Sequence, residues 1–178
     1  MYVLVSLLTL SLTARADDPA TADATASPKQ VPWTAADSPG GHCTAAEQVI
    51  LSCEIEGKAG KVLSLCASKE VTATTGWMAY RFGALGAVEL EVPSTPAPPP
   101  ATFAYATESE GPQISHSTWT FTNEGHTFVV HDSFFHGEQE NGLTITLPDG
   151  REVPLSCTQP AINHFGALYA LYPQTGSP

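Results

Sequence analysis

Two short apolar runs separated by a glycine-containing turn are bracketed by three cysteines, Cys43, Cys53 and Cys66. The first run covers residues 49–55 and the second covers residues 61–68, and in the first run apolar and polar side chains alternate. Alternation with a period of two is typical of a β-strand, because successive side chains of a strand point to opposite faces. The segment therefore predicts a β-hairpin that disulfide bonds brace.

The same period recurs along most of the chain. Besides the first hairpin, strands are expected at residues 75–82, 88–92, 103–107, 114–121, 127–135, 143–147 and 152–157. Turn residues separate them, including TNEG at 122–125 and PDG at 148–150, and glycine in such turns permits positive φ. About nine short strands with hairpin turns predict an all-β fold, either a single antiparallel β-sandwich or a small barrel. One short helix is expected near residues 44–48 or 163–171.

The N-terminus has the pattern of an export signal. Residues 2–12 form an apolar run shorter than the roughly 20 residues that span a bilayer as a helix, and the small-x-small cleavage pattern ARA follows. We interpret residues 1–16 as a signal peptide, the alternative being a buried or disordered N-terminal segment. The mature protein is then expected to be periplasmic or secreted, without a membrane span.

The domain organisation follows from composition. Residues 17–41 contain few large apolar side chains and are expected to form a disordered leader. Residues 42–172 suffice for one disulfide-braced β domain and not for two, and residues 173–178 form a tail. The Pro-rich stretch 93–100 is expected to be a semi-extended loop inside this domain, because proline lacks the N–H that helices and strands need.

The charge balance is strongly acidic. Without residues 1–16, six basic side chains face eighteen acidic ones, which gives a net charge of −12. Such a surface repels phosphate backbones and anionic lipid headgroups, so we expect neither nucleic acid nor a membrane surface as a partner. A basic protein or an envelope glycan remains as a candidate partner, although acidity also serves solubility alone.

Four cysteines allow three disulfide connectivities, and side-chain parity ranks them. A hairpin centred in residues 56–60 does not place Cys53 opposite Cys66, and it moves Cys66 toward the end where Cys43 lies. We therefore favour Cys43–Cys66 and Cys53–Cys157, a ranking that a β-bulge would change. A redox or metal role for the cysteines is disfavoured because no Cys-x-x-Cys pair is present.

Metal-ligating side chains gather in one expected hairpin, at His126, His131, Asp132, His136 and Glu138. Ligands on one face of a strand are an even number of residues apart, whereas these histidines follow each other at intervals of five. Only a bend near Ser133 would bring His131, His136 and Glu138 together. We expect no metal and no cofactor.

No catalytic motif is apparent. Adjacent His131, Asp132 and Ser133 do not form a catalytic triad, because neighbours on a strand point to opposite faces. Neither a Gly-x-Ser-x-Gly elbow nor a phosphate-binding glycine loop is present. We assign no catalytic residue and favour a non-catalytic protein, while the question whether it is an enzyme stays open.

Trp77 and Arg81 form the candidate recognition surface. In the expected strand 75–82 they share one face, and the other face carries the core-forming side chains Met78, Tyr80 and Phe82. An outward Trp close to an Arg is typical of a binding hot spot. The alternatives are that the rest of the fold covers both faces, or that Arg81 pairs with an acidic neighbour. An aromatic platform for a sugar or peptide requires Trp119 or Tyr105 alongside.

Several segments together resemble a family of uncharacterised exported bacterial proteins. They are Cys43, LSC at 51–53, GKVLSLCAS at 60–68, GWMAYRFG at 76–83, VEL at 88–90, LSCTQP at 155–160 and LYAL at 168–171. The chain departs from the family pattern where Tyr172 and Pro173 replace a further Cys-Asp. The resemblance implies export and a cysteine-braced domain, and it implies no activity.

Three classes of function remain. The first is an exported, non-catalytic binding or envelope-associated protein whose ligand the sequence does not name. The second is an inhibitor of a basic envelope-attacking enzyme such as lysozyme, which the small, acidic, disulfide-braced domain suits. The third is a hydrolase with a dispersed His, Asp and Glu site, which requires a deep pocket where such side chains converge.

Overall fold

The structure is a computed structural model of the chain, and it describes residues 41–172. The signal peptide and the tail assigned from the sequence lie outside the described residues, as does the leader except for Gly41. Within residues 41–172, no helix is long and apolar enough to cross a membrane.

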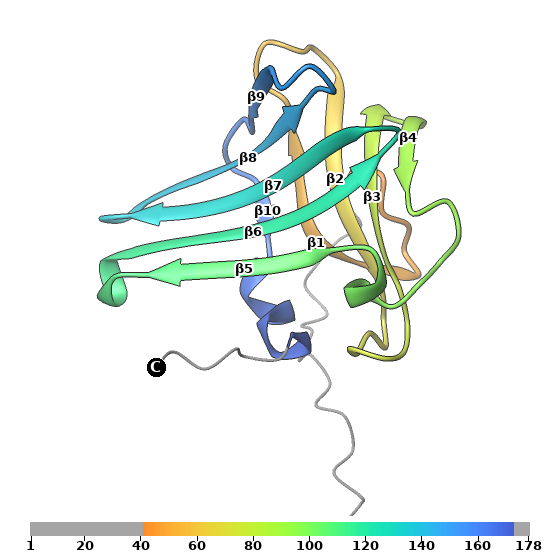
Figure 1. Cartoon of the computed structure of the whole chain (residues 1–178), viewed down its shortest axis with the longest axis horizontal. Helices are drawn as coiled ribbons and strands as arrows, with labels where there is room; N and C mark the ends of the chain where they lie inside the picture. Colours follow the sequence, from red (N-terminus) through yellow and green to blue (C-terminus); the bar gives the residue numbers. More distant parts are fainter. Residues whose placement is uncertain (1–40, 173–178) are drawn as a thin grey trace, which may run out of the picture.

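Two antiparallel sheets of five strands face each other, and their strands cross at a steep angle (Figure 1). The first sheet has the order β10 (Ile162–Asn163), β1 (Glu47–Glu54), β2 (Lys61–Ser68), β3 (Met78–Ala84) and β4 (Ala87–Val92). The second has the order β5 (Ala104–Ser109), β6 (Ile114–Asn123), β7 (His126–Phe135), β8 (Glu138–Thr146) and β9 (Glu152–Ser156). The all-β expectation is confirmed, and the architecture is a β-sandwich.

Consecutive strands mostly pair as hairpins, as the turn residues predict. β6 and β7 are joined by Glu124 and Gly125, both with positive φ, and β8 pairs with β9 across the turn at residues 148–150. The hairpin between β7 and β8 turns at His136 and Gly137, also with positive φ. β8 begins at Glu138, five residues before the strand expected at 143. The sequence does not predict this start, because the first residues of β8 are polar and show no apolar alternation.

The connection between the two sheets is rich in proline. The stretch 93–100 leads from β4 of the first sheet toward β5 of the second, and its last two residues begin a 3-10 helix, η1 (Pro99–Ala101). A second 3-10 helix, η2 (Gly111–Gln113), joins β5 to β6. The third, η3 (Phe165–Leu171), lies at one of the two places where a short helix is expected, whereas residues 44–48 lead into β1.

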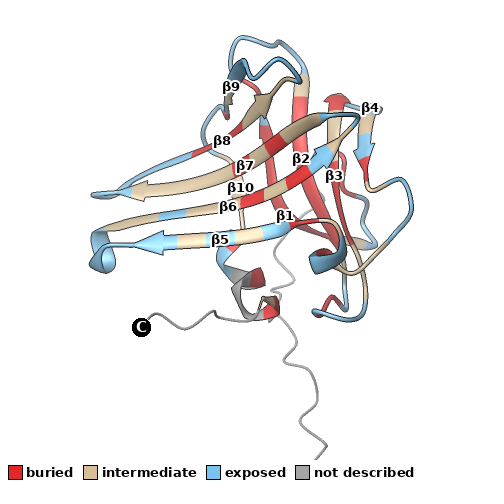
Figure 2. Ribbon diagram, viewed as in Figure 1, coloured by how far each residue is buried: buried red, intermediate tan, exposed pale blue. Residues whose placement is uncertain are grey.

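The core lies between the sheets, where the buried positions of both concentrate (Figure 2). Aromatic rings fill its centre. Phe121 stacks on Phe128 with ring centroids 4.9 Å apart, and Tyr80 of β3 lies 4.9 Å from Phe121. Trp119 is fully buried beside η3, with its ring centroid 6.1 Å from that of Phe165. This cross-sheet contact of aromatic side chains holds the two layers together.

Both disulfides join the pairs that side-chain parity favours. Cys43 is bonded to Cys66 on the outer face of the first sheet, and Cys53 is bonded to Cys157 within the core. A β-bulge at Ile50 does interrupt the pairing of β1 with β2. The bulge lies on the far side of Cys53 from the turn, so it leaves Cys53 opposite Leu63 and the ranking unchanged.

Candidate ligand-binding cavity

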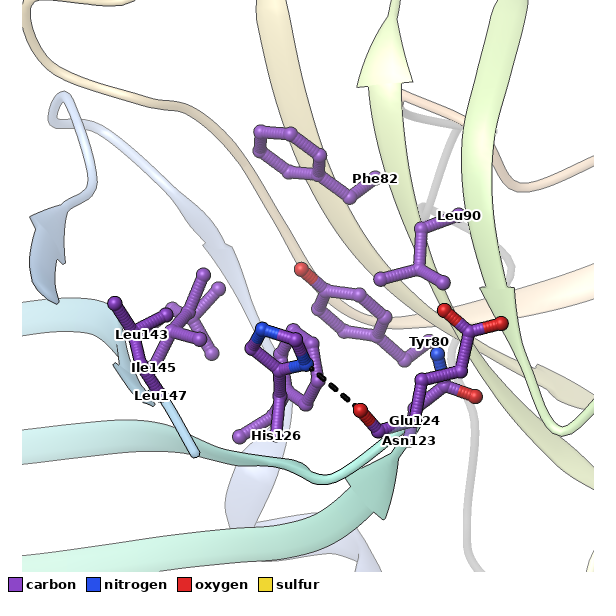
Figure 3. A pocket seen from close by; sticks show the side chains of 10 residues that line it. Tyr80, Phe82, Leu90, Asn123, Glu124, His126, Leu143, Ile145 and Leu147 are labelled. Carbon is purple, nitrogen blue, oxygen red and sulfur yellow. Dashed lines mark hydrogen bonds between the residues drawn. The ribbon is translucent and has the colours of Figure 1, made fainter. Parts of the chain in front are cut away.

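A cavity of about 380 Å³ lies between the two sheets (Figure 3). Its walls come from β3 and β4 on one side and from β7, β8 and the turn between β6 and β7 on the other. The lining residues are Tyr80, Phe82, Leu90, Asn123, Glu124, His126, Phe128, Leu143, Ile145 and Leu147. A mostly apolar cavity of this size with few polar groups is typical of small-molecule sites.

Strand parity brings the apolar walls together. Tyr80 and Phe82 point inward from β3 because they are two residues apart, and Leu90 of β4 pairs with Phe82. Leu143 and Ile145 point inward from β8 for the same reason. Phe82, Leu90 and Ile145 are half-buried, in contrast to the fully buried Tyr80 and Leu143. The two apolar faces therefore do not close on each other at this end of the sandwich.

The Tyr80 hydroxyl is the deepest polar group of the cavity. The side chain is 1 % exposed, and its oxygen points toward the open space between the walls (Figure 3). No hydrogen bond to this oxygen is found within residues 41–172. Burial raises the pKa of Tyr80, so the hydroxyl keeps its proton at neutral pH and is available as a donor.

His126 places a second polar atom in the same space. Its Nδ1 donates a hydrogen bond of 3.1 Å to the backbone carbonyl oxygen of Glu124, because a carbonyl oxygen can only accept. In the neutral imidazole the proton is then on Nδ1, and Nε2 is an acceptor. Nε2 points away from the turn and into the cavity (Figure 3). The cavity thus offers one donor and one acceptor among apolar side chains.

Among the described residues, no lysine or arginine lines this cavity. Indeed, the chain contains neither residue type between Arg81 and Arg151, which covers most of the second sheet. The one carboxylate among the lining residues is that of Glu124, which is exposed in the β6–β7 turn. A ligand with a negative charge therefore finds no counter-charge in the cavity wall.

The candidate recognition residue Arg81 is engaged on the outer face of the first sheet. Its Nη1 and Nη2 lie 2.8 and 3.0 Å from the carboxylate oxygens of Glu47, and its Nε lies 3.1 Å from Glu91. Nη1 also donates to the carbonyl oxygen of His42 at 3.2 Å. The side chains of Arg81 and Glu47 are only 13 % and 7 % exposed. Arg81 is therefore held in ion pairs with acidic neighbours, which is one of the alternatives to a recognition role.

Trp77 is half-buried and lies just before β3, with the Arg81 guanidinium carbon 5.9 Å from its ring centroid. Trp119 and Tyr105 do not lie alongside it. They belong to the second sheet, where their rings contact each other at 4.7 Å, and Trp119 is fully buried. The aromatic platform that would need these rings beside Trp77 is therefore not formed.

The Glu47–Arg81 pair predicts an acid-sensitive contribution to stability. Burial by itself raises the pKa of Glu47, but hydrogen bonds from Arg81 and Thr44 outweigh it and hold the pKa below the ordinary value. A carboxyl with a lowered pKa in the folded state stabilises the protein above its unfolded pKa, and this contribution is lost as pH falls through the folded pKa. We expect stability to decline below about pH 4.3, the ordinary range of glutamate.

The measurement is urea unfolding of the wild type and Glu47→Gln between pH 7 and pH 3. The two free energies of unfolding should converge as the pH falls, because glutamine has no proton to gain. Curves that stay parallel over this range would show that Glu47 does not contribute the acid dependence.

The histidines of the β7–β8 hairpin are separated rather than gathered. His126 points into the cavity, His131 packs over Gly142 on the outer face, and His136 lies in the turn. The odd intervals between them place His126 and His131 on opposite faces of β7. The pairing of β7 with both neighbours continues through Ser133 to Phe135 without a register shift. Among residues 41–172, no group of three metal-ligating side chains is found.

Asp132 points inward from β7, away from its neighbours His131 and Ser133. Its Oδ1 accepts hydrogen bonds of 2.9 Å from Gln139, Asn141 and Asn163. Asp132 is therefore part of a polar network that ties β7 and β8 to β10 of the other sheet. Three adjacent residues do not act as a catalytic relay, because the strand directs them to opposite faces.

The sequence does not predict one contact between a histidine and a serine. His116 Nδ1 lies 2.8 Å from the Ser133 hydroxyl, and Glu108 is directly opposite His116 on β5. The pairing of β6 with β7 places His116 opposite Ser133, and this register would have to be known in order to predict the contact. The backbone amides around this pair take part in the strand ladders, so they offer no oxyanion site. The arrangement is a surface hydrogen bond.

Comparison of the chain with protein-family models, with curated proteins and with solved structures finds no match in any of the three. The cavity, with the Tyr80 hydroxyl and the His126 imidazole, is thus the feature of the fold that points to a function.

Proposed function

We propose that the protein is an exported, non-catalytic binding protein that holds a small apolar molecule between its two sheets. The observation that carries this proposal is the apolar cavity of about 380 Å³, which is large enough for a ligand and lined by residues from both sheets. Its few polar side chains would set the specificity for a ligand, and the described lining residues include no serine, threonine, cysteine or lysine.

Two features support export. The N-terminal sequence has the apolar run and cleavage pattern of a signal peptide. Both disulfides are buried or partly buried bridges that leave no free cysteine within residues 41–172. Structural disulfides of this kind persist in oxidising compartments such as the periplasm or the extracellular space.

The test is binding of N-phenyl-1-naphthylamine, an uncharged aromatic probe whose fluorescence rises in an apolar environment. The wild-type protein should enhance the fluorescence saturably. Leu90→Trp should weaken the binding at least tenfold, because the half-buried Leu90 lines the cavity and the larger ring would fill it.

Val88→Trp is the matched control. Val88 lies on the same strand, is 45 % exposed and does not line the cavity, so this variant should bind the probe like the wild type. Thermal unfolding of both variants checks that they are folded. Equal loss of binding in the two variants, or equal retention, would rule out the cavity as the binding site.

A further inference from the structure

We propose that the ligand is uncharged and carries a hydroxyl group, which accepts a hydrogen bond from Tyr80 and donates one to the His126 imidazole. This inference rests on the proposed function and adds the chemical class of the ligand. It combines the Tyr80 hydroxyl, which has no hydrogen-bond partner among residues 41–172, an acceptor fixed by the backbone, and described wall residues without a cation.

Tyr80 provides the first step. The neighbouring core positions are filled by Phe121 and Phe128, whose rings lie 4.9 and 5.9 Å from that of Tyr80. A phenylalanine would serve this packing equally well and would leave no polar atom in the cavity. The Tyr80 hydroxyl opens onto the cavity and has no hydrogen-bond partner among residues 41–172, so a ligand that supplies an acceptor gains a hydrogen bond there. The Tyr80 hydroxyl therefore selects for an acceptor.

His126 provides the second step. The positive φ of Glu124 at 49° belongs to the tight turn between β6 and β7, and this turn presents the Glu124 carbonyl to Nδ1 at 3.1 Å. The hydrogen bond fixes the tautomer, so that Nε2 faces the cavity as an acceptor. His126 therefore selects for a donor. A hydroxyl group is both a donor and an acceptor, so it matches the hydrogen-bonding chemistry of Tyr80 and of His126.

The charges around the cavity exclude an ionised head group. A carboxylate would lie among apolar side chains without a lysine or arginine partner, and the exposed Glu124 at the rim would repel it. An ammonium group would lose its hydration on entering the cavity, and the only carboxylate among the described lining residues is that of the exposed Glu124. Burial of an unpaired charge is costly in either case.

The volume bounds the size of the ligand. A buried apolar cavity of about 150 Å³ holds benzene, which corresponds to roughly 25 Å³ for each non-hydrogen atom. On this scale, the cavity of about 380 Å³ accommodates a molecule of about 15 non-hydrogen atoms. A medium-chain alcohol or a small ring compound with one hydroxyl group fits this description.

The experiment measures how well four dodecyl compounds displace N-phenyl-1-naphthylamine from the wild-type protein and from Tyr80→Phe. The compounds are 1-dodecanol, dodecyl methyl ether, dodecanoate and dodecylamine, the first two below their solubility limits and the two ions below their micelle concentrations. The ether accepts a hydrogen bond but donates none, and the other two carry opposite charges. 1-Dodecanol should bind about fivefold more tightly than the ether, and at least tenfold more tightly than either ion.

Tyr80→Phe should retain the fluorescent probe and lose about fivefold in affinity for 1-dodecanol, because the substitution removes only the hydroxyl. His126→Phe should abolish the preference for the alcohol over the ether, because the acceptor is removed. If the ions bind as tightly as the alcohol, or if Tyr80→Phe binds 1-dodecanol like the wild type, the inference is wrong. Absence of probe binding to the wild type would instead overturn the proposed function.

Discussion

Replacing Cys53 and Cys157 together by alanine is expected to lower the free energy of unfolding by about 4 to 5 kcal/mol. The bond closes a loop of 104 residues, and it joins β1 of one sheet to the end of β9 of the other. A crosslink over a long loop removes much conformational entropy from the unfolded chain. The measurement is urea unfolding under non-reducing conditions.

Cys43→Ala with Cys66→Ala is the matched comparison. This bond spans only 23 residues, and its cysteines are as buried as those of the other pair. We expect a loss of about 3 kcal/mol. The decisive result is which double variant loses more free energy of unfolding, because the four cysteines are similarly buried and the two bonds differ in loop length. A larger loss from the 23-residue bridge would show that native-state contacts, and not loop length, determine the contribution of each bond.

Arg81→Met is expected to lower the free energy of unfolding by about 3 to 5 kcal/mol. The substitution keeps an apolar side chain of similar length on β3, but the Glu47 carboxylate, 7 % exposed, loses both hydrogen bonds from Arg81 and keeps the one from the Thr44 N–H. Removal of one member of a buried pair is costly chiefly because the other charge remains. Chemical unfolding at pH 7 measures the effect.

The double variant Glu47→Gln with Arg81→Met tests this explanation. It removes both charges, so it should be more stable than Arg81→Met alone by about 2 kcal/mol or more. A double variant as unstable as Arg81→Met would mean that the packing of the guanidinium over Trp77, and not the stranded carboxylate, is what the arginine supplies.

The alternation of side chains predicts most of the fold, and its failures have local causes. Strands with an apolar face, such as β2 and β3, are expected within a few residues of their observed bounds. The start of β8 and the two-residue β10 are missed, because polar or very short strands show no period. Parity also predicts both disulfides, because the bulge at Ile50 lies away from Cys53.

The candidate site is only half visible in the sequence. Tyr80 and Phe82 are expected to point into the core, and both line the cavity. The opposite wall comes from β7 and β8, and which of their residues face Tyr80 depends on how the two sheets cross. The burial of Arg81 is equally non-local, because it depends on the segment at His42 lying across the outer face of the first sheet.

The position of β4 at the border of its sheet has a consequence for how a ligand reaches the cavity. β4 pairs with β3 alone and supplies Leu90, so one wall of the cavity is an edge strand of the first sheet. Local opening is least costly where few hydrogen bonds and contacts must break. A guest wider than the mouth would therefore enter as β4 swings aside while the two sheets stay together. Occupancy would then slow amide hydrogen exchange in β4 more than in β2.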